Sequence, residues 1–458
     1  MRTKLAAAVA AAALDPRYKR NVEALRRVQP EDLRPSDITA RLGGPWIPAN
    51  VVERFSAEVI GVSTRVRHTR EIACWSVDLS RFEGAAEATS QWGTERRHAG
   101  LLLSDALNAA SPQVWDVKWV DGTETRTLNA KETEAAKEKM QAIKQAFEGW
   151  VWTDADRTDR LARIYNDAFN NLVPRAFDGS HLQLPGISSA VTLRDHQKRV
   201  AWRIISAGGT YMAHAVGSGK TMAMSVAVME QKRLGFISKA LMTVPGHCLA
   251  QASREFLMLY PNARILVADE TNFAKEKRAR FLARAATANW DCIIVTHSAF
   301  KFLAAPAWFE RDMMQAMIRA FEALLLLVDG GDRITTKRIE RAKEAMQAKL
   351  EMLGTDKDDM LTIAEIGVDQ IIVDEAQEFR KLSFPTNMSG LKGVDPDGSQ
   401  RAWDLYVKSR FIALSQPTRA LILASGTPIT NTLVMRPRPK EALIDVASVV
   451  GRDRHPCW

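Results

Sequence analysis

One stretch, HAVGSGKT at residues 214–221, constrains the fold of this chain more than any other part of the sequence. The apolar run at 210–213 before it predicts a buried strand, and the run at 221–229 after it predicts a helix. A glycine-rich turn between a strand and a helix points backbone N–H groups at an anion, and the helix N-terminus adds partial positive charge. The pattern therefore predicts a phosphate-binding loop that consists of Gly217, Ser218, Gly219, Lys220 and Thr221.

Two side chains of this loop have specific expected roles. Lys220 would reach the β- and γ-phosphates of a nucleotide, and the Thr221 hydroxyl would bind Mg²⁺. The longer form of the motif has a glycine where this chain has His214, so the match is incomplete. A chance Gly/Ser loop is the alternative interpretation, and the surrounding sequence decides between the two.

A second apolar run, residues 370–373, ends in two acids, Asp374 and Glu375. A site that hydrolyses a nucleotide needs an acid at a strand end to hold the metal ion, usually with a carboxylate beside it that orients the attacking water. We therefore predict Asp374 as a second ligand of Mg²⁺ and Glu375 as the residue that orients water. Lys220, Asp374 and Glu375 are the predicted catalytic residues.

A third apolar run, residues 420–423, precedes the sequence ASGTP at 424–428. In this order, GSGKT, DEAQ at 374–377 and SGTP resemble motifs I, II and III of superfamily-two helicases and DNA translocases. The resemblance implies a RecA-like domain that binds ATP. It also implies that the state of the nucleotide is coupled to the grip on DNA by Gln377, Ser425, Gly426 and Thr427.

Three further segments fit the same family. Leu193-Arg194-Asp195-His196-Gln197 resembles the adenine-reading glutamine motif of the Swi/Snf branch, which implies nucleotide contacts by Arg194 and Gln197. Residues 243–245 and 295–297 resemble motifs Ia and Ib, which line the nucleic-acid strand. A threonine or proline at a strand end can also serve a structural role. The resemblance implies DNA contacts by Thr243, Pro245, Thr296 and His297.

A narrower resemblance covers most of the chain, from about residue 15 to about residue 432. Its motifs are PWIPANVVERF (45–55), FEGWVW (147–152), YNDAFN (165–170), DGSHLQLPG (178–186) and VDEAQEFRKL (373–382). Together they resemble the helicase part of methylase–helicase proteins of phages and conjugative plasmids. A methyltransferase domain often precedes this part, but the sequence contains neither NPPY nor DPPY, so we do not expect methylation.

The charge balance favours an anionic partner. The 458 residues include 63 Lys and Arg against 54 Asp and Glu, a net charge of +9. Such an excess is typical of proteins that bind the nucleic-acid backbone without sequence preference, although it also occurs as plain solubility charge. The four cysteines are scattered without a CxxC pair, which indicates reduced thiols in the cytoplasm and neither a disulfide framework nor a zinc site.

The N-terminus imitates a secretion signal, because the alanine-rich run at 5–14 follows two basic residues. Alanine is only weakly hydrophobic, so we expect the start of a helix instead. Elsewhere no apolar stretch approaches the roughly 18 residues that a membrane-spanning helix requires. A membrane role is therefore not expected.

The alternation of apolar runs and helical segments predicts an α/β fold. We expect a mixed α+β accessory region at 1–185, with strands near 115–120 and 121–129 and a charged helix at 130–152. Residues 186–432 would form the RecA-like P-loop NTPase domain, with a parallel sheet and helices on both faces. A helical insertion at about 303–367 has Ile339, Met346 and Leu353 at heptad spacing, which predicts a helical hairpin.

Some features leave two interpretations open. Seven tryptophans of the accessory region either stack on bases or, as is more usual, anchor a core. Two basic segments either lie on duplex DNA or form a solvated face. The tryptophans are Trp46, Trp75, Trp92, Trp115, Trp119, Trp150 and Trp152, and the basic residues are Arg333, Lys337, Arg338, Arg341 and Lys343 in the insertion and Lys275, Lys277, Arg278, Arg280 and Arg284 before it.

Motors of superfamily two hydrolyse ATP between two RecA-like domains, and the second domain supplies an arginine. Only 26 residues follow Thr432, and the segment 433–458 departs from the family pattern, which suggests a truncation or a frame change. We therefore expect the front half of a DNA-dependent ATPase that hydrolyses ATP slowly by itself. Its partners would be DNA and a second RecA-like domain or a methyltransferase on another chain. A non-catalytic DNA-binding or scaffolding remnant is the alternative.

Overall fold

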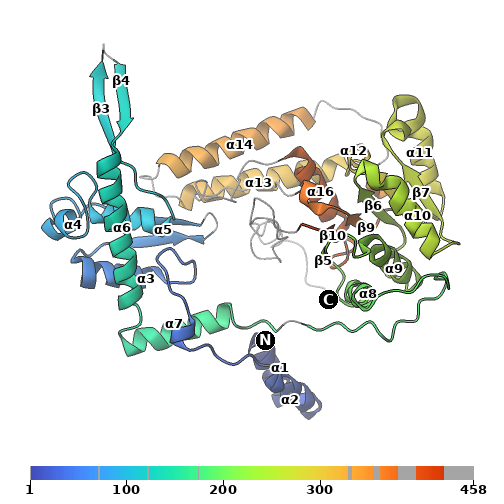
Figure 1. The fold of residues 1–458 in the computed structure, drawn as a ribbon, viewed down its shortest axis with the longest axis horizontal. Coiled ribbons are helices and arrows are strands. Elements are labelled where there is room, and N and C mark those ends of the chain that lie inside the picture. The colour runs from blue at the N-terminus through green and yellow to red at the C-terminus, as the bar shows by residue number, and fades with distance from the viewer. Residues whose placement is uncertain are drawn as a thin grey trace. The chain divides into compact units, whose positions relative to one another are not determined.

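The computed structural model describes residues 2–70, 73–120, 123–173, 175–327, 333–353, 362–379 and 399–427. The chain forms two compact units (Figure 1). The N-terminal unit consists mainly of Met1–Arg175, and the C-terminal unit consists of most of the chain from Ala176 onward. The predicted tail at 433–458 lies outside the described residues.

The N-terminal unit combines helices with two antiparallel strand pairs, β1 with β2 and β3 with β4. The predicted strands near 115–120 and 121–129 and the predicted charged helix are confirmed. The strands are β1 (Val66–Thr69), β2 (Cys74–Val77), β3 (Trp115–Val120) and β4 (Thr123–Leu128). The helices are α1 (Arg2–Leu14), α2 (Lys19–Arg27), α3 (Ala49–Phe55), α4 (Ala86–Ser90), α5 (Ala99–Leu107), α6 (Ala130–Trp150) and α7 (Ala155–Ala168), with single turns η1 (Pro16–Tyr18), η2 (Pro35–Asp37) and η3 (Ser56–Ile60).

Aromatic side chains form the centre of this unit. Phe55 of α3 and Phe147 of α6 are fully buried and meet edge to face, with ring centroids 5.1 Å apart. Trp75 is buried as well, whereas Trp115 is 43% exposed. The core interpretation is thus confirmed for Trp75 and for four partly buried tryptophans that pack on the same cluster, namely Trp46, Trp92, Trp150 and Trp152. The side chain of Trp119 lies outside the described ones.

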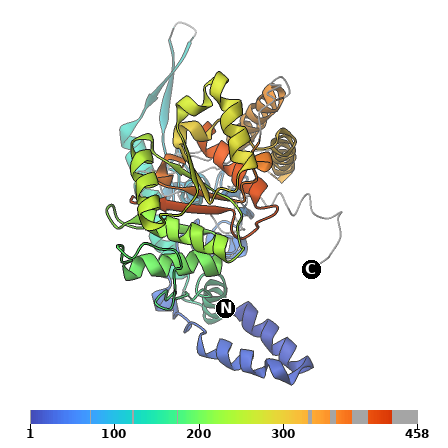
Figure 2. The same ribbon diagram turned by 90° about the vertical axis from the view of Figure 1, so that its right-hand side faces the viewer.

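The C-terminal unit contains a six-stranded sheet in the order β5-β10-β9-β6-β8-β7. Every neighbouring pair is parallel, as the sequence predicts for the α/β fold. Figure 2 shows helices on both faces of this sheet. The strands are β5 (Thr210–Ala213), β6 (Ala240–Val244), β7 (Ile265–Ala268), β8 (Cys292–Thr296), β9 (Gln370–Val373) and β10 (Leu421–Ser425).

The helices of the C-terminal unit connect these strands. Helices α8, α9 and α10 share one apolar cluster with alternate residues of the sheet, which places all three on one face. The helices are α8 (Asp195–Ala207), α9 (Lys220–Arg233), α10 (Leu249–Leu259), α11 (Lys275–Thr287), α12 (His297–Phe300), α13 (Ala307–Leu327), α14 (Arg333–Leu353), α15 (Ile363–Ile366) and α16 (Gln400–Ile412), with single turns η5 (Gly246–Cys248), η6 (Glu270–Phe273) and η7 (Ala376–Phe379).

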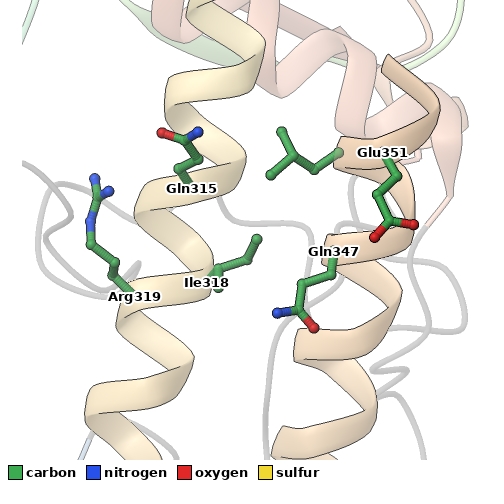
Figure 3. A pocket seen from close by; sticks show the side chains of 6 residues that line it. Gln315, Ile318, Arg319, Gln347 and Glu351 are labelled. Carbon is green, nitrogen blue, oxygen red and sulfur yellow. The ribbon is translucent and has the colours of Figure 1, made fainter. Parts of the chain in front are cut away.

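The predicted helical insertion consists of α13 and α14. Ile339 and Met346 of the heptad pattern are buried, and Leu353 is partly buried. An open groove of about 520 Å³ lies between the two helices, and Ile318 and Gln347 point into it (Figure 3). None of the predicted site residues lines this groove. Among the described residues, no helix has both the length and the apolar character needed to cross a membrane.

Candidate active site

The predicted motifs meet at one edge of the sheet. In the parallel register, Ser425 at the end of β10 pairs with Ala213 at the end of β5. Thr243 near the end of β6 pairs with Val373 at the end of β9. Because the carboxyl ends of parallel strands lie together, the loops that follow them surround one site. The structure thus brings motifs I, II and III together.

The phosphate loop joins β5 to α9. Gly217 and Gly219 both have φ +78°, a conformation that glycine adopts without a steric penalty. A Cβ at Gly219 would also lie 2.2 Å from the Nε2 atom of Gln197, so only glycine fits there. Lys220 is the first residue of α9, and its side chain is buried. The loop therefore has the strand-to-helix geometry that the sequence predicts.

Gln197 holds the phosphate loop from the neighbouring helix, α8. Its Nε2 donates to the carbonyls of Ser218 and Gly219, at 3.2 Å each. Its Oε1 accepts from the backbone N–H of Arg194 at 2.8 Å. The ring Nε2 of His196 lies 2.8 Å from the same Ser218 carbonyl. The amide of Gln197 is therefore engaged at both ends, and adenine recognition by Gln197 and Arg194 stays a prediction.

Asp374 follows β9 and lies in the interior, with 8% of its surface exposed. Burial raises its pKa above the ordinary value, and the negative charge of Glu375 raises it further. A cation bound beside this carboxylate would offset the free-energy cost of its buried negative charge. Among the described residues, no cluster of three or more His, Cys, Asp or Glu side chains could hold a metal ion. Mg²⁺ commonly takes only one or two carboxylates and completes its shell with substrate phosphates and water, so the single buried carboxylate of Asp374 is compatible with this ion, and the site of Asp374 and Thr221 stays a prediction.

Glu375 adopts a left-handed backbone conformation, with φ +48°. Such a conformation is uncommon outside glycine and is found at functional sites. Its backbone N–H donates to Asp374 Oδ1 at 3.0 Å. Its carboxylate Oε1 lies 3.6 Å from the Nζ atom of Lys220. The turn therefore directs Glu375 at the lysine of the phosphate loop.

A row of polar contacts continues from this ion pair, and we call Lys220, Glu375, Gln377 and Ser425 the motif network. Gln377 Nε2 donates to Glu375 Oε2 at 2.7 Å, and Ser425 Oγ donates to Gln377 Oε1 at 2.7 Å. The backbone N–H of Thr427 donates to Ser425 Oγ at 3.1 Å. The network therefore connects motif I to motif III through motif II.

The backbone of Gly426 lies close to the phosphate loop, which leaves little room for a side chain. A Cβ at Gly426 would lie 2.8 Å from Val216 Cγ2 and 3.3 Å from the Nζ atom of Lys220. A larger residue would push against the phosphate loop and its lysine. Position 426 therefore favours glycine for reasons of space.

The residues of motifs Ia and Ib lie wholly or partly in the interior. Thr243, Thr296 and His297 are buried, and Pro245 is partly buried. Thr296 Oγ1 accepts from the N–H of Ala299 and donates to a carboxylate oxygen of η6. His297 Nε2 donates to the backbone carbonyl of the motif II aspartate at 2.9 Å, and burial lowers the pKa of His297, so the ring is neutral at pH 7. Thr296 and His297 thus connect the end of β8 to neighbouring loops, and DNA contacts by all four residues stay a prediction.

Sequence reasoning missed two contributors to the site. His196 supports the phosphate loop, and Glu270 of η6 accepts the hydrogen bond from Thr296 at 2.8 Å. Neither residue belongs to a recognisable pattern of its own. The only sequence signal for His196 is its position beside Gln197.

Two family models match this chain. One is described as a probable helicase domain and matches residues 202–436. The other is described as a domain of unknown function (DUF8437) and matches residues 41–171. The helicase model covers the phosphate loop and motifs II and III, which confirms the helicase-like character that the motifs predict.

Individual proteins show weaker likenesses. The chain is 22% identical over 358 residues to the Defense against restriction protein B of Escherichia phage P1, which covers 69% of this chain and 16% of that protein. Two solved structures of the Sulfolobus solfataricus SWI2/SNF2 ATPase core are also similar, one of them in complex with dsDNA. Their identities are 13% and 15%, their TM-scores 0.30 and 0.27, and they cover 58% and 56% of this chain. The matches cover 37% and 36% of those two chains, so this chain spans well under two thirds of each relative.

Proposed function

This chain belongs to the family of the probable helicase domain, and on that premise we propose that it is the ATP-binding part of a DNA-dependent ATPase of helicase superfamily two. The motif network supports this proposal most directly. It joins the lysine of the phosphate loop to Ser425, so occupancy of the phosphate site can be transmitted to the segment after β10. We assign residues 186–432 to the RecA-like domain and residues 1–185 to an accessory region.

In the proposed reaction, the loop amides and Lys220 bind the phosphates of ATP. An incoming γ-phosphate would compete with Glu375 for Lys220, which lies only 3.6 Å from that carboxylate. Glu375 would then be free to orient a water molecule and to accept its proton. Mg²⁺, when held by Thr221 and Asp374, would supply polarisation of the phosphate oxygens.

We propose DNA as the second ligand, bound through its backbone without sequence preference. The net charge of +9 supports an anionic partner of this kind. A second RecA-like domain would complete the cleft and supply an arginine to the transition state. The scattered cysteines, without a CxxC pair in the sequence, support a cytoplasmic location, where thiols stay reduced.

Replacing Lys220 by alanine is expected to weaken ATP binding by about 1.5–3 kcal/mol, because the substitution removes charge-assisted hydrogen bonds to the phosphates. Isothermal titration calorimetry with Mg²⁺–ATP measures the change as a roughly 10- to 150-fold increase in Kd. The matched control is Lys337→Ala, at an exposed position of α14. Equal ATP affinity of the Lys220→Ala variant and the unsubstituted protein would refute the site.

DNA binding is expected to weaken steeply with salt and to ignore base sequence. Each neutralised phosphate contributes about 0.9 to the slope of log Kd against log salt concentration, because a counterion is released. Fluorescence anisotropy with two duplexes of unrelated sequence measures both properties. A flat salt response, or a strong preference for one duplex, would contradict the proposed function.

A further inference from the structure

Helix α11 of the C-terminal unit carries a strong excess of positive charge. Its sequence, KEKRARFLARAAT, has five basic residues and one acid. Lys277, Arg280 and Arg284 follow one another at spacings of three and four, so they share one face of the helix, and all three are exposed. The opposite face is buried through Phe281 and Leu282. We call the three exposed residues the α11 basic face.

Within the described ranges, the α11 basic face has no acidic partner. In the described part of the chain, no Asp or Glu forms an ion pair with Lys277, Arg280 or Arg284. Helix α14 differs, because its Lys343 forms an ion pair with Glu322 at 3.5 Å. Unpaired like charges on one face repel one another. An external polyanion would relieve this repulsion.

The helix starts at the edge of the sheet where the motifs lie. Strand β7 ends at Ala268, and η6 then leads into the first turn of α11. Glu270 of η6 accepts a hydrogen bond from Thr296 Oγ1 of motif Ib, at 2.8 Å. Phe273 packs on Phe281 of α11, with ring centroids 4.9 Å apart. The start of α11 is therefore anchored near motif Ib, and the helix runs from there toward the opposite edge of the sheet, where Lys239 Nζ donates to the carbonyl of Ala285 at 2.7 Å.

From these observations we propose that the α11 basic face binds the sugar–phosphate backbone of duplex DNA, an inference that rests on the proposed DNA-dependent function. At 1.5 Å per residue, the seven steps from Lys277 to Arg284 span roughly 10 Å along the helix. One DNA strand carries a phosphate about every 3.4 Å along the duplex axis, so the face is as long as about three intervals between phosphates. Contacts to phosphates carry no sequence information, in accord with the predicted lack of sequence preference.

The test compares three variants of the full chain with the unsubstituted protein. The first, K277Q/R280Q/R284Q, removes the charges of the α11 basic face. The second, K277R/R280K/R284K, retains them. The third, K337Q/R341Q/K349Q, removes three exposed charges from α14 as a matched control. Anisotropy of a labelled 30-base-pair duplex is measured at several salt concentrations, and ATP affinity is measured alongside as a check of folding.

The glutamine variant of α11 is expected to lower the slope of log Kd against log salt concentration by about 2–3. The charge-retaining variant and the α14 control should keep the slope of the unsubstituted protein, and ATP affinity should be the same in all four proteins. An unchanged slope in the α11 glutamine variant, or an equal loss in the α14 control, overturns the inference while the proposed function stands. Failure of the unsubstituted protein to bind DNA would instead refute the proposed function.

Discussion

Replacing Glu375 by glutamine is expected to lower the rate of ATP hydrolysis by about 10²- to 10⁴-fold, the usual contribution of a general base. The amide keeps the size of the side chain but cannot accept a proton from water. ATP binding should persist, because the substitution also removes the ion pair that occupies Lys220. Single-turnover release of phosphate, with and without DNA, measures the rate even when hydrolysis is slow.

The neighbouring Glu378 provides the matched control. It lies on η7, the short turn that directly follows Glu375, is exposed, and forms an ion pair with Arg401 at 2.9 Å. Glu378→Gln therefore makes the same chemical change outside the motif network and should leave the rate within a factor of about two, since an exposed ion pair contributes little. Equal rates for the Glu375→Gln variant and the unsubstituted protein would mean that another group activates the water.

Replacing Lys408 by methionine is expected to destabilise the C-terminal unit by up to about 3–5 kcal/mol, because it leaves a partly buried carboxylate, that of Asp404, without its cation. Lys408 of α16 is fully buried and forms an ion pair with Asp404. Its Nζ also donates to the carbonyl of Phe300 at 2.8 Å and lies 3.9 Å from the centroid of that ring. The contact ties α16 to α12, the helix that follows motif Ib. Urea unfolding monitored by tryptophan fluorescence measures the loss.

The double variant Lys408→Met/Asp404→Asn separates the charge from the packing. Burial lowers the pKa of Lys408 and raises that of Asp404, while each opposes the shift of the other through its charge. Removing both charges should recover at least half of the lost stability. Lys337→Met, at an exposed position, should change stability by less than about 0.5 kcal/mol. If the double variant is as unstable as the single one, the unpaired carboxylate of Asp404 is not the cause.

The outline of the fold was accessible from sequence because its signals are local. Buried parallel strands appear as short apolar runs, and each motif residue directly follows such a run along the chain. The strand before the phosphate loop, the strand before Asp374 and the strand before Ser425 are all confirmed. The same holds for the helical insertion, where Ile339 and Met346 of the heptad pattern are buried. The periodicity of apolar residues and the order of the motifs along the chain were sufficient to predict these elements.

The contacts between the site residues could not be predicted from such local signals. Strand order places β10 between β5 and β9, and this neighbourhood brings Ser425 to Gln377. The resemblance implied that Gln197 reads adenine, yet in the structure its amide holds the phosphate loop. Nothing along the chain predicts either contact, because the residues involved are separated by tens of positions.

The sequence by itself determined which chemistry the chain carries: a phosphate loop, an acid pair at a strand end, and the order of the motifs. Only the tertiary structure decided which of these side chains contact one another and which are buried in the interior. Thr296 and His297 have the residue types of a DNA-contacting motif, yet both are buried and bonded to neighbouring loops. The physical reason is that periodicity assigns a residue to one face of a strand. Whether that face meets solvent, a ligand or another element depends on packing between segments distant along the chain.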